Sequence, residues 1–312
     1  MRKRDSRFEI RDSRFSAGAA IMLALWALFL LSALVISWAL DINSRLAVSS
    51  EGTRMLKAEA VACSGAEVAL NPTTKPGSPN LNGQLNGGAS YNARMTGEGG
   101  RLNINWIVAG ENPDRLEILR RYLQNKGIDL NERDTMVDSL LDWVEPNVGL
   151  HHMNAPPESD DYHPAHAGAL TRIDELKKIA GWQEFTSTPG WDDDFTVSTT
   201  MDSAIDLAWA SRDVLLALPG LTNDMVDRYL QVRQGPDGVD GTDDDTEFTS
   251  VGEVFGVMGN PQLANRLTGL VALNVPVFRV TSIGTAGKTT RTVQMVFRRV
   301  GVMPQVITWR EF

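Results

Sequence analysis

The sequence predicts an α+β protein in which a long N-terminal helix packs on a small antiparallel sheet that carries a large duplicated helical insertion. Three observations predict this class. An uncharged segment opens the chain, strand-like segments with turn signals lie towards both ends of the remainder, and a helical pattern repeats between them. We expect a leader, the N-terminal helix, the first part of the sheet, the insertion and the last part of the sheet at residues 1–18, 19–70, 71–112, 113–273 and 274–312.

The first forty residues combine a basic leader with an apolar segment. Residues 1–18 hold six Lys or Arg against three Asp or Glu, and residues 15–40 carry no charge. A helix of about 20 apolar residues crosses a bilayer, and its basic flank stays in the cytoplasm. Three interpretations remain open: a cleaved secretory signal, an uncleaved anchor, and a leader cut between Gly18 and Ala19 on the cytoplasmic side. The long apolar segment and the small-residue junction favour the third.

This junction resembles the class III leader of type IV pilins and of type II secretion pseudopilins. Most such chains place a Glu five residues after the cut, where this chain has Leu23. With Leu25 and Trp26, the junction is similar to the start of the minor pseudopilin K family of the type II secretion system, which also lacks that Glu. A buried Glu needs a partner, such as a neighbour's N-terminal amine. The resemblance therefore implies transmembrane assembly through Leu23, Leu25 and Trp26, with this subunit at the tip.

The resemblance also implies a pilin-like fold, an inner-membrane location with a single membrane pass, and a C-terminal body in the periplasm. It implies cleavage by prepilin peptidase, methylation, and assembly with I- and J-type minor pseudopilins, the major pseudopilin and the inner-membrane secretion platform. In that family the subunit initiates or caps the pseudopilus for protein export across the outer membrane. The resemblance implies no catalytic activity.

The composition argues against nucleic acid as a partner and shows no catalytic motif. The net charge is −9, and it is about −12 once the +3 leader is removed, so the body repels polyanions. The lone Cys63 cannot form an internal disulfide, and we expect it to be buried. The sequence holds no Ser-His-Asp order, nucleophile elbow, phosphate loop or dinucleotide fingerprint, which disfavours an anchored periplasmic enzyme.

Turn signals locate the strands of the expected sheet. Residues 71–88 are rich in Pro, Gly and Asn and predict a loop. The glycines at 97–100 predict a hairpin between strands at 91–96 and 101–107. A second hairpin, between strands at 277–283 and 290–300, is predicted around residues 285–288, and a last strand covers 306–310.

The expected insertion contains an internal repeat. Residues 170–176 match residues 248–254, and the upstream Met136-Val137-Asp138 matches Met225-Val226-Asp227. Capping-box spacing pairs Thr171 with Asp174, and Ser250 with Glu253.

Residues 215–233 look like a helix-hairpin-helix, or SAM-like, element. Such hairpins can bind phosphate, but residues 201–260 hold twelve Asp or Glu against three Lys or Arg. We expect a scaffold role, with a membrane-anchored DNA-binding or DNA-uptake protein as the alternative.

An acidic loop is the main candidate for a metal site. Residues 235–247 place six carboxylates within thirteen residues, among glycines that let the chain wrap around an ion. Calcium accepts roughly six to eight oxygen ligands in flexible geometry. The alternative is a solvated acidic loop. The expected ligands are Asp237, Asp240, Asp243, Asp245 and Glu247.

A weaker second site is expected at Asp142, Glu145, Asp160 and Asp161. The resemblance favours both sites, since calcium braces the helical domain of that family. The family's Asp-Trp-x-Asp pattern is Asp-Trp-Val-Glu here, which leaves this site the weaker of the two. The four histidines, His151, His152, His163 and His166, are expected in a solvated loop, because Pro164 prevents helical presentation of the last pair to zinc.

Overall fold

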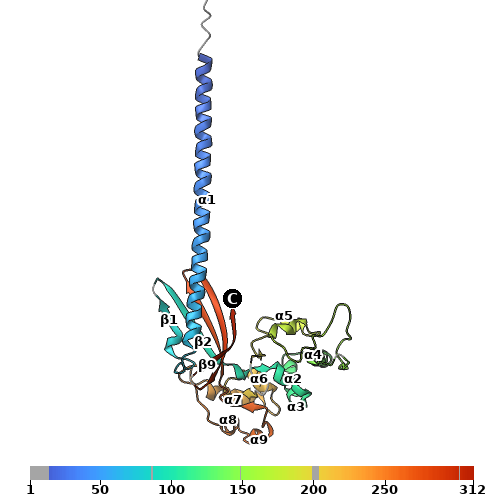
Figure 1. The fold of residues 1–312 in the computed structure, drawn as a ribbon. Helices are drawn as coiled ribbons and strands as arrows, with labels where there is room; N and C mark the ends of the chain where they lie inside the picture. The colour runs from blue at the N-terminus through green and yellow to red at the C-terminus, as the bar shows by residue number, and fades with distance from the viewer. Residues whose placement is uncertain (1–13, 86, 148, 199–203, 302) are drawn as a thin grey trace, which may run out of the picture. The chain divides into compact units, whose positions relative to one another are not determined.

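The computed structural model describes residues 14–85, 87–147, 149–198, 204–301 and 303–312 (Figure 1). The chain divides into two compact units, Met1–Leu56 and Lys57–Phe312. Helix α1 (Arg14–Val68) runs from the described part of the first unit into the second. It ends before Asn71-Pro72, where proline cannot continue a helix.

A five-stranded antiparallel sheet forms part of the second unit, with strand order β1-β2-β7-β8-β9. The register places Val280 of the third strand in this order between Met95 and Met295 of its neighbours, so these side chains share one face. The predicted C-terminal hairpin is confirmed, with its turn at Gly287. The strands are β1 (Asn82–Leu85), β2 (Ala89–Gly97), β7 (Val277–Ala286), β8 (Thr289–Val300) and β9 (Met303–Glu311).

The C-terminal part of α1 packs closely on this sheet through small side chains. Ala62 and Ala66 of α1, and Ala69 just after its end, are buried against Val280, Met295 and other residues of the apolar face. Gly284 of β7 has no side chain because an added Cβ would collide with the backbone of Ala58 and of Ala62. The close approach of helix and strand therefore depends on this glycine.

The chain between β2 and β7 forms two helical modules. Each module is closed by a two-residue parallel strand pair, β3 (Leu102–Asn103) with β4 (Phe195–Thr196) and β5 (Ile205–Asp206) with β6 (Val271–Ala272). The first module contains α2 (Ile104–Val108), η3 (Ala109–Glu111), α3 (Pro113–Asn125), α4 (Leu130–Val144), η4 (Ile173–Lys178) and α5 (Gln183–Ser187). The second contains α6 (Arg212–Ala217), α7 (Asn223–Arg233), α8 (Val251–Val257) and α9 (Leu263–Arg266).

The repeated segments occupy equivalent places in the two modules. Val137 of α4 and Val226 of α7 are both buried, as the repeat predicts. In the second module Glu253 accepts the backbone N–H of Thr249 at 2.9 Å. In the first, the acid that caps is Glu175, which accepts the N–H of Thr171 at 2.9 Å. The predicted Thr171–Asp174 pairing is therefore wrong, because Glu175 and not Asp174 is the repeat equivalent of Glu253.

One aromatic core joins the two modules. Trp182 is fully buried, and its indole N–H donates to the Met136 carbonyl at 2.8 Å. Its ring meets that of Phe195 edge to face, with centroids 6.1 Å apart. Tyr229 of the second module belongs to the same buried cluster.

Three expectations about the sheet region were wrong. Residues 97–100 do not make a hairpin: residues 98–100 form a short 3-10 helix, η2 (Glu98–Gly100), and the chain then enters the insertion. Gly100 is required because a Cβ there would collide with the Trp209 backbone, so it serves packing and not a turn. The expected loop at 71–88 instead supplies η1 (Pro79–Leu81) and the edge strand β1. Cys63 is half-buried, because it lies at the margin of the contact between α1 and the sheet.

Candidate functional site

The predicted processing and assembly residues lie on α1. Gly18 and Ala19 are exposed, and nothing stands within 4 Å of a Cβ built on Gly18. Leu23, Leu25 and Trp26 are exposed as well. Among the described residues, one helix, Gly18–Val68, is long and apolar enough to cross a membrane by length and composition. The rest of the predicted leader, residues 1–13, lies outside the described residues.

The carboxylates of the acidic loop are engaged by the protein itself. Asp240 receives the Nε and Nη2 donors of the buried Arg233, both at 2.8 Å, and a third bond from Gln234. Asp245 accepts the Gly241 backbone N–H at 2.6 Å. Glu247 forms an exposed ion pair with Lys75 at 3.4 Å. The loop is therefore folded around its own donors.

These contacts bear on whether the loop suits a metal. In the part of the chain that the structure describes, no group of three or more His, Cys, Asp or Glu side chains is arranged to hold a metal ion. In this arrangement the carboxylate of Asp240 accepts hydrogen bonds from Arg233 and Gln234, and that of Asp245 accepts one from Gly241. Calcium would need these side chains to turn towards a common point. Calcium binding at Asp237, Asp240, Asp243, Asp245 and Glu247 stays a prediction.

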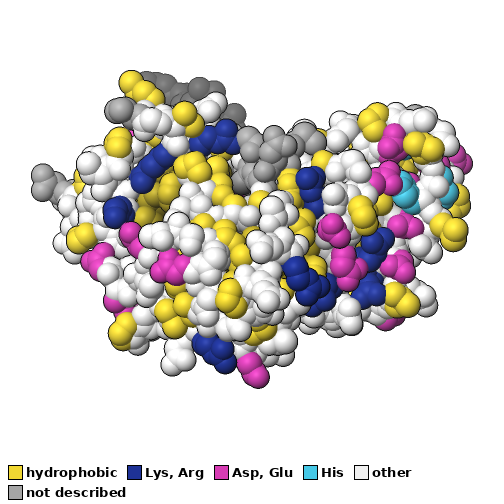
Figure 2. All heavy atoms as spheres, turned by 90° about the horizontal axis from the view of Figure 1, so that it is seen from below, with side chains coloured by type: hydrophobic (Ala, Val, Ile, Leu, Met, Phe, Trp, Pro, Cys, Tyr) yellow, Lys and Arg dark blue, Asp and Glu magenta, His cyan; other side chains and the backbone are white. Residues whose placement is uncertain are grey.

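The residues of the weaker predicted site are drawn into a histidine cluster. Asp142 is buried, and its Oδ1 lies 2.5 Å from Nδ1 of His152 while its Oδ2 lies 2.7 Å from Nδ1 of His151. His166 contacts the Glu145 carbonyl at 2.6 Å. Figure 2 shows histidines of this face beside acidic side chains. The expectation of a solvated position was wrong for His152 and His166, which are partly buried, because Asp142 binds the first and the Glu145 carbonyl binds the second. His151 and His163 are exposed, as expected. Asp160 and Asp161 of this predicted site are exposed.

The histidine pKa values follow from these contacts. Burial lowers the pKa of His152, but hydrogen bonds to Asp142 and Glu111 outweigh it and raise the pKa above its usual value. The contact with the Glu145 carbonyl raises the pKa of His166. The fold thus favours the protonated forms of His152 and His166.

In the predicted helix-hairpin-helix, arginines that could have bound phosphate form hydrogen bonds within the second module instead. Arg212 donates to Asp227 at 2.7 Å, and the buried Arg233 donates to the carbonyls of Leu207 and Ala210 as well as to Asp240. These arginines hold the second module together. A scaffold role therefore remains our interpretation of the hairpin.

A buried ion-pair cluster links the sheet to the insertion. Glu98 in η2 is fully buried and receives Nε and Nη2 of Arg279 from β7, at 2.7 and 2.6 Å. Arg101 adds a contact at 3.2 Å, and the Thr196 hydroxyl donates to the same carboxylate. Sequence reasoning missed this cluster, since Glu98 and Arg279 stand 181 positions apart and no local pattern connects them.

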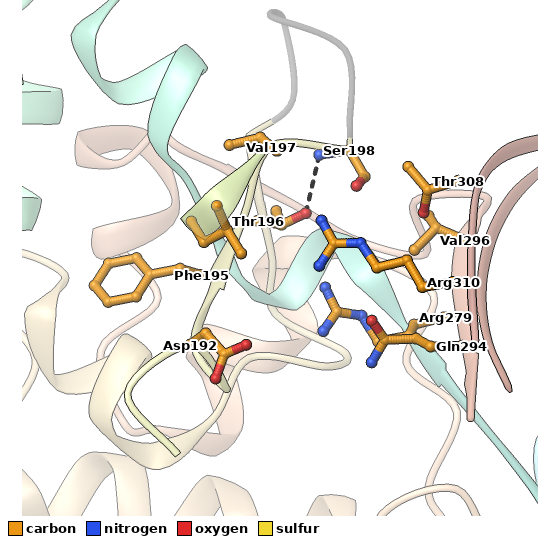
Figure 3. A pocket seen from close by; sticks show the side chains of 11 residues that line it. Asp192, Phe195, Thr196, Val197, Ser198, Arg279, Gln294, Val296, Thr308 and Arg310 are labelled. Atoms are coloured by element: carbon orange, nitrogen blue, oxygen red, sulfur yellow. Dashed lines mark hydrogen bonds between the residues drawn. The ribbon is translucent and has the colours of Figure 1, made fainter. Parts of the chain in front are cut away.

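A small pocket opens beside this cluster, between the sheet and the first module. Figure 3 shows Arg279, Gln294 and Arg310 from the sheet facing Thr196 and Ser198. The pocket is polar, and Arg279 is already held by Glu98. Arg310 also lines the pocket, and it takes part in no ion pair among the described residues.

A long apolar N-terminal helix whose C-terminal part packs on an antiparallel sheet defines the pilin-like class of protein. Residues 100–195 match the family model described as "Type II secretion system (T2SS), protein K". The chain is also similar to a chain in the crystal structure of the GspK–GspI–GspJ complex of the type 2 secretion system from enterotoxigenic Escherichia coli. The TM-score is 0.60 at 14% identity, and the match covers 86% of this chain and 99% of that one. The search of curated proteins found no match.

These findings confirm the predicted resemblance to protein K and the predicted fold class. The family match lies in the first helical module and its entry from the sheet, and the structural match extends over most of the chain. Residues 100–195 are thus similar to protein K of the type II secretion system, and the fold is shared with a chain of the GspK–GspI–GspJ complex.

Proposed function

We propose that this chain is a minor pseudopilin at the tip of the type II secretion pseudopilus, where it initiates or caps assembly for protein export across the outer membrane. The observation that carries the proposal is a pilin-like body joined to a helical insertion between β2 and β7, together with an apolar helix that has Leu23 where most pilin-like chains have Glu. A subunit without that Glu lacks the group that pairs with a neighbour's amine. The insertion adds bulk that hinders stacking of a further subunit.

The helix supports an anchor in the inner membrane, with the leader in the cytoplasm and residues after Asp41 in the periplasm. Gly18 and Ala19 lie at an exposed stretch of α1 that a membrane peptidase can reach. We infer that prepilin peptidase cuts after Gly18 and that the new N-terminus is methylated. Replacing Gly18 by Val is expected to leave the leader attached, which intact mass would reveal.

The proposed partners are I- and J-type minor pseudopilins, then the major pseudopilin and the secretion platform. The solved complex whose chain shares this fold contains GspK, GspI and GspJ, which supports the first two. We assign the chain a structural role and no catalytic step, since its buried charges serve packing.

The tip position is tested by gold labelling of an epitope on the insertion in cells that overproduce pseudopili. We expect label at one end of each fibre, and label along the whole fibre would contradict the proposal. A Leu23→Glu variant sharpens the test, because it restores the carboxylate that the internal subunits carry. Its matched control is Leu25→Glu, which adds the same charge at another exposed position of α1.

A further inference from the structure

The charges of the chain are divided unevenly between the sheet and the insertion. Residues 277–312 hold six Lys or Arg against one Glu, whereas residues 101–273 hold thirteen Lys or Arg against thirty Asp or Glu. Arg298 of β8 and Arg310 of β9 take part in no ion pair among the described residues. The pKa of Asp174 is lowered chiefly by Lys177, with which Asp174 forms an ion pair at 2.9 Å. The charge of Arg310 makes a smaller contribution. The last strands are therefore basic within an acidic protein, and Arg298 and Arg310 are partly exposed cations without an ion pair among the described residues.

Strand β9 lies at the edge of the sheet and is paired with β8 alone. Phe312 and Thr292 exchange both backbone hydrogen bonds, at 2.9 and 3.2 Å. Antiparallel pairing alternates, so the N–H and C=O groups of Trp309 and Glu311 are directed away from β8, towards the open edge. Pro304 and the register shift at Val296/Phe297 interrupt the first half of the edge. The open stretch is residues 308–312.

The side chains of this open stretch alternate between two faces. Trp309 lies opposite Met295 on the face that packs against α1, and it is 37% exposed. Arg310 lies opposite Gln294 on the other face, where it lines the pocket of Figure 3 together with Ser198 and Asp192. A strand laid along this edge would thus meet an indole on one side and a guanidinium on the other.

Natural sheets usually protect a free edge with charges, a short strand or a cover. The opposite edge follows this rule, since β1 has four residues. The β9 edge has nine residues and leaves Val306, Ile307, Trp309 and Phe312 exposed, the last at 61%. An unpaired edge with apolar side chains suits the addition of a strand from another chain.

We propose that residues 308–312 of β9 pair with an extended segment of a companion minor pseudopilin, which adds a sixth strand to the sheet. The segment would place an apolar side chain against Trp309 and a carboxylate beside Arg310, because those are the groups the edge offers. The unpaired Arg298 and Arg310 favour an acidic segment by charge. This inference rests on the proposed function, which supplies a pilin-like neighbour.

Hydrogen exchange tests the backbone pairing directly. The full chain in detergent is compared alone and in complex with its I- and J-type companions, by mass spectrometry with residue resolution. The amides of Trp309 and Glu311 are expected to exchange at least about tenfold more slowly in the complex than in the free chain, since they gain hydrogen-bond acceptors. The amides of the β1 edge are the internal control and should not change. A complex that forms without protection of β9 would overturn the inference and leave the proposed function intact, whereas failure to form any complex would overturn both.

Charge reversal tests the side-chain contact. Arg310→Glu is expected to weaken the complex about tenfold, because it opposes the partner's carboxylate. The matched control Arg291→Glu reverses a charge on the neighbouring strand β8, at a residue opposite Gly284 of β7, and should have little effect. Trp309→Lys should weaken the complex, while Leu85→Lys on the β1 edge should not; hydrogen exchange of β8 in each free variant confirms that the sheet is intact. Equal weakening by target and control variants would contradict the inference.

Discussion

The five-stranded sheet and the helical insertion differ in what holds each together. In the sheet, regular ladders satisfy the backbone, and alanines of α1 pack on the apolar face, with Gly284 at the closest approach. The insertion has short helices and strands, and buried polar side chains form hydrogen bonds with the backbone groups that these elements leave unpaired. Asn105, for example, bonds both the N–H and the carbonyl of Leu170, each at 2.8 Å. The sheet should therefore be sensitive to added volume, and the insertion to the loss of polar partners.

The largest effect is expected where the two regions meet. Glu98→Gln removes the carboxylate that Arg279 and Arg101 share, and leaves two guanidinium groups partly buried without a counter-charge. We expect a loss of about 3–5 kcal/mol in the free energy of unfolding, measured by denaturant titration of the full chain in detergent. The control Asp227→Asn breaks the exposed pair with Arg212 and should change stability much less. Similar losses in both variants would contradict the role given to Glu98.

A pH effect is expected at Asp206, which anchors the second module. Its buried carboxylate accepts the backbone N–H groups of Ala208, Asn274 and Val275. Burial raises the pKa of Asp206 to about 6, although these donors lower it. A proton is thus bound by the folded chain, and not by the unfolded chain, between about pH 4 and 6. Stability from this group is complete below pH 4 and is lost as the pH rises through 6.

The pH effect can be measured against Asp206→Asn, which does not titrate. The stability advantage of the wild type over this variant should grow by up to about 3 kcal/mol when the pH falls from 7 to 4. The measurement is the free energy of unfolding at several pH values. An advantage that stays constant with pH would show that Asp206 is ionised throughout.

A smaller loss is expected when volume is added to the sheet. Gly284→Ala puts a methyl group against the backbone of Ala58 and Ala62, so α1 must move away. We expect a loss of about 1–3 kcal/mol, read from the melting temperature. The matched control is Gly256→Ala in α8, where nothing lies within 4 Å of the new methyl group. That change should be neutral or stabilising, since alanine favours a helix. A tolerated Gly284→Ala would refute the close contact.

The smallest effect is expected from calcium. If the loop at residues 235–247 binds calcium with a dissociation constant of about 0.1 mM, 1 mM calcium should stabilise the full chain by about 1.4 kcal/mol. A double variant, Asp237→Asn with Asp243→Asn, should lose this gain, and magnesium serves as the control ion. No shift of the melting temperature in calcium would remove the prediction.

Elements that depend on nearby residues could be predicted from the sequence, whereas contacts between distant residues could not. The apolar helix, the C-terminal hairpin and the repeat can be predicted because each depends on residues close together in the chain. The glycines at 97–100 give the same local signal as a hairpin turn, but Gly100 is needed for packing on Trp209, more than a hundred residues away. The Glu98 cluster could not be predicted for the same reason.

The histidine cluster around Asp142 could be predicted in part from the sequence. His151 and His152 follow Asp142 by nine and ten positions, so their proximity could be suspected from the sequence. What the sequence lacks is the burial of Asp142 in α4, which turns nearby histidines into partners of a carboxylate.

The central claim is that the leader is cleaved from the apolar helix on the cytoplasmic side of the membrane, and that the helix then assembles with the helices of related subunits. N-terminal sequencing of the protein from the cell envelope tests this most directly. The account predicts a mature chain that begins at Ala19. A chain that begins at Met1, or anywhere beyond the apolar helix, would contradict it.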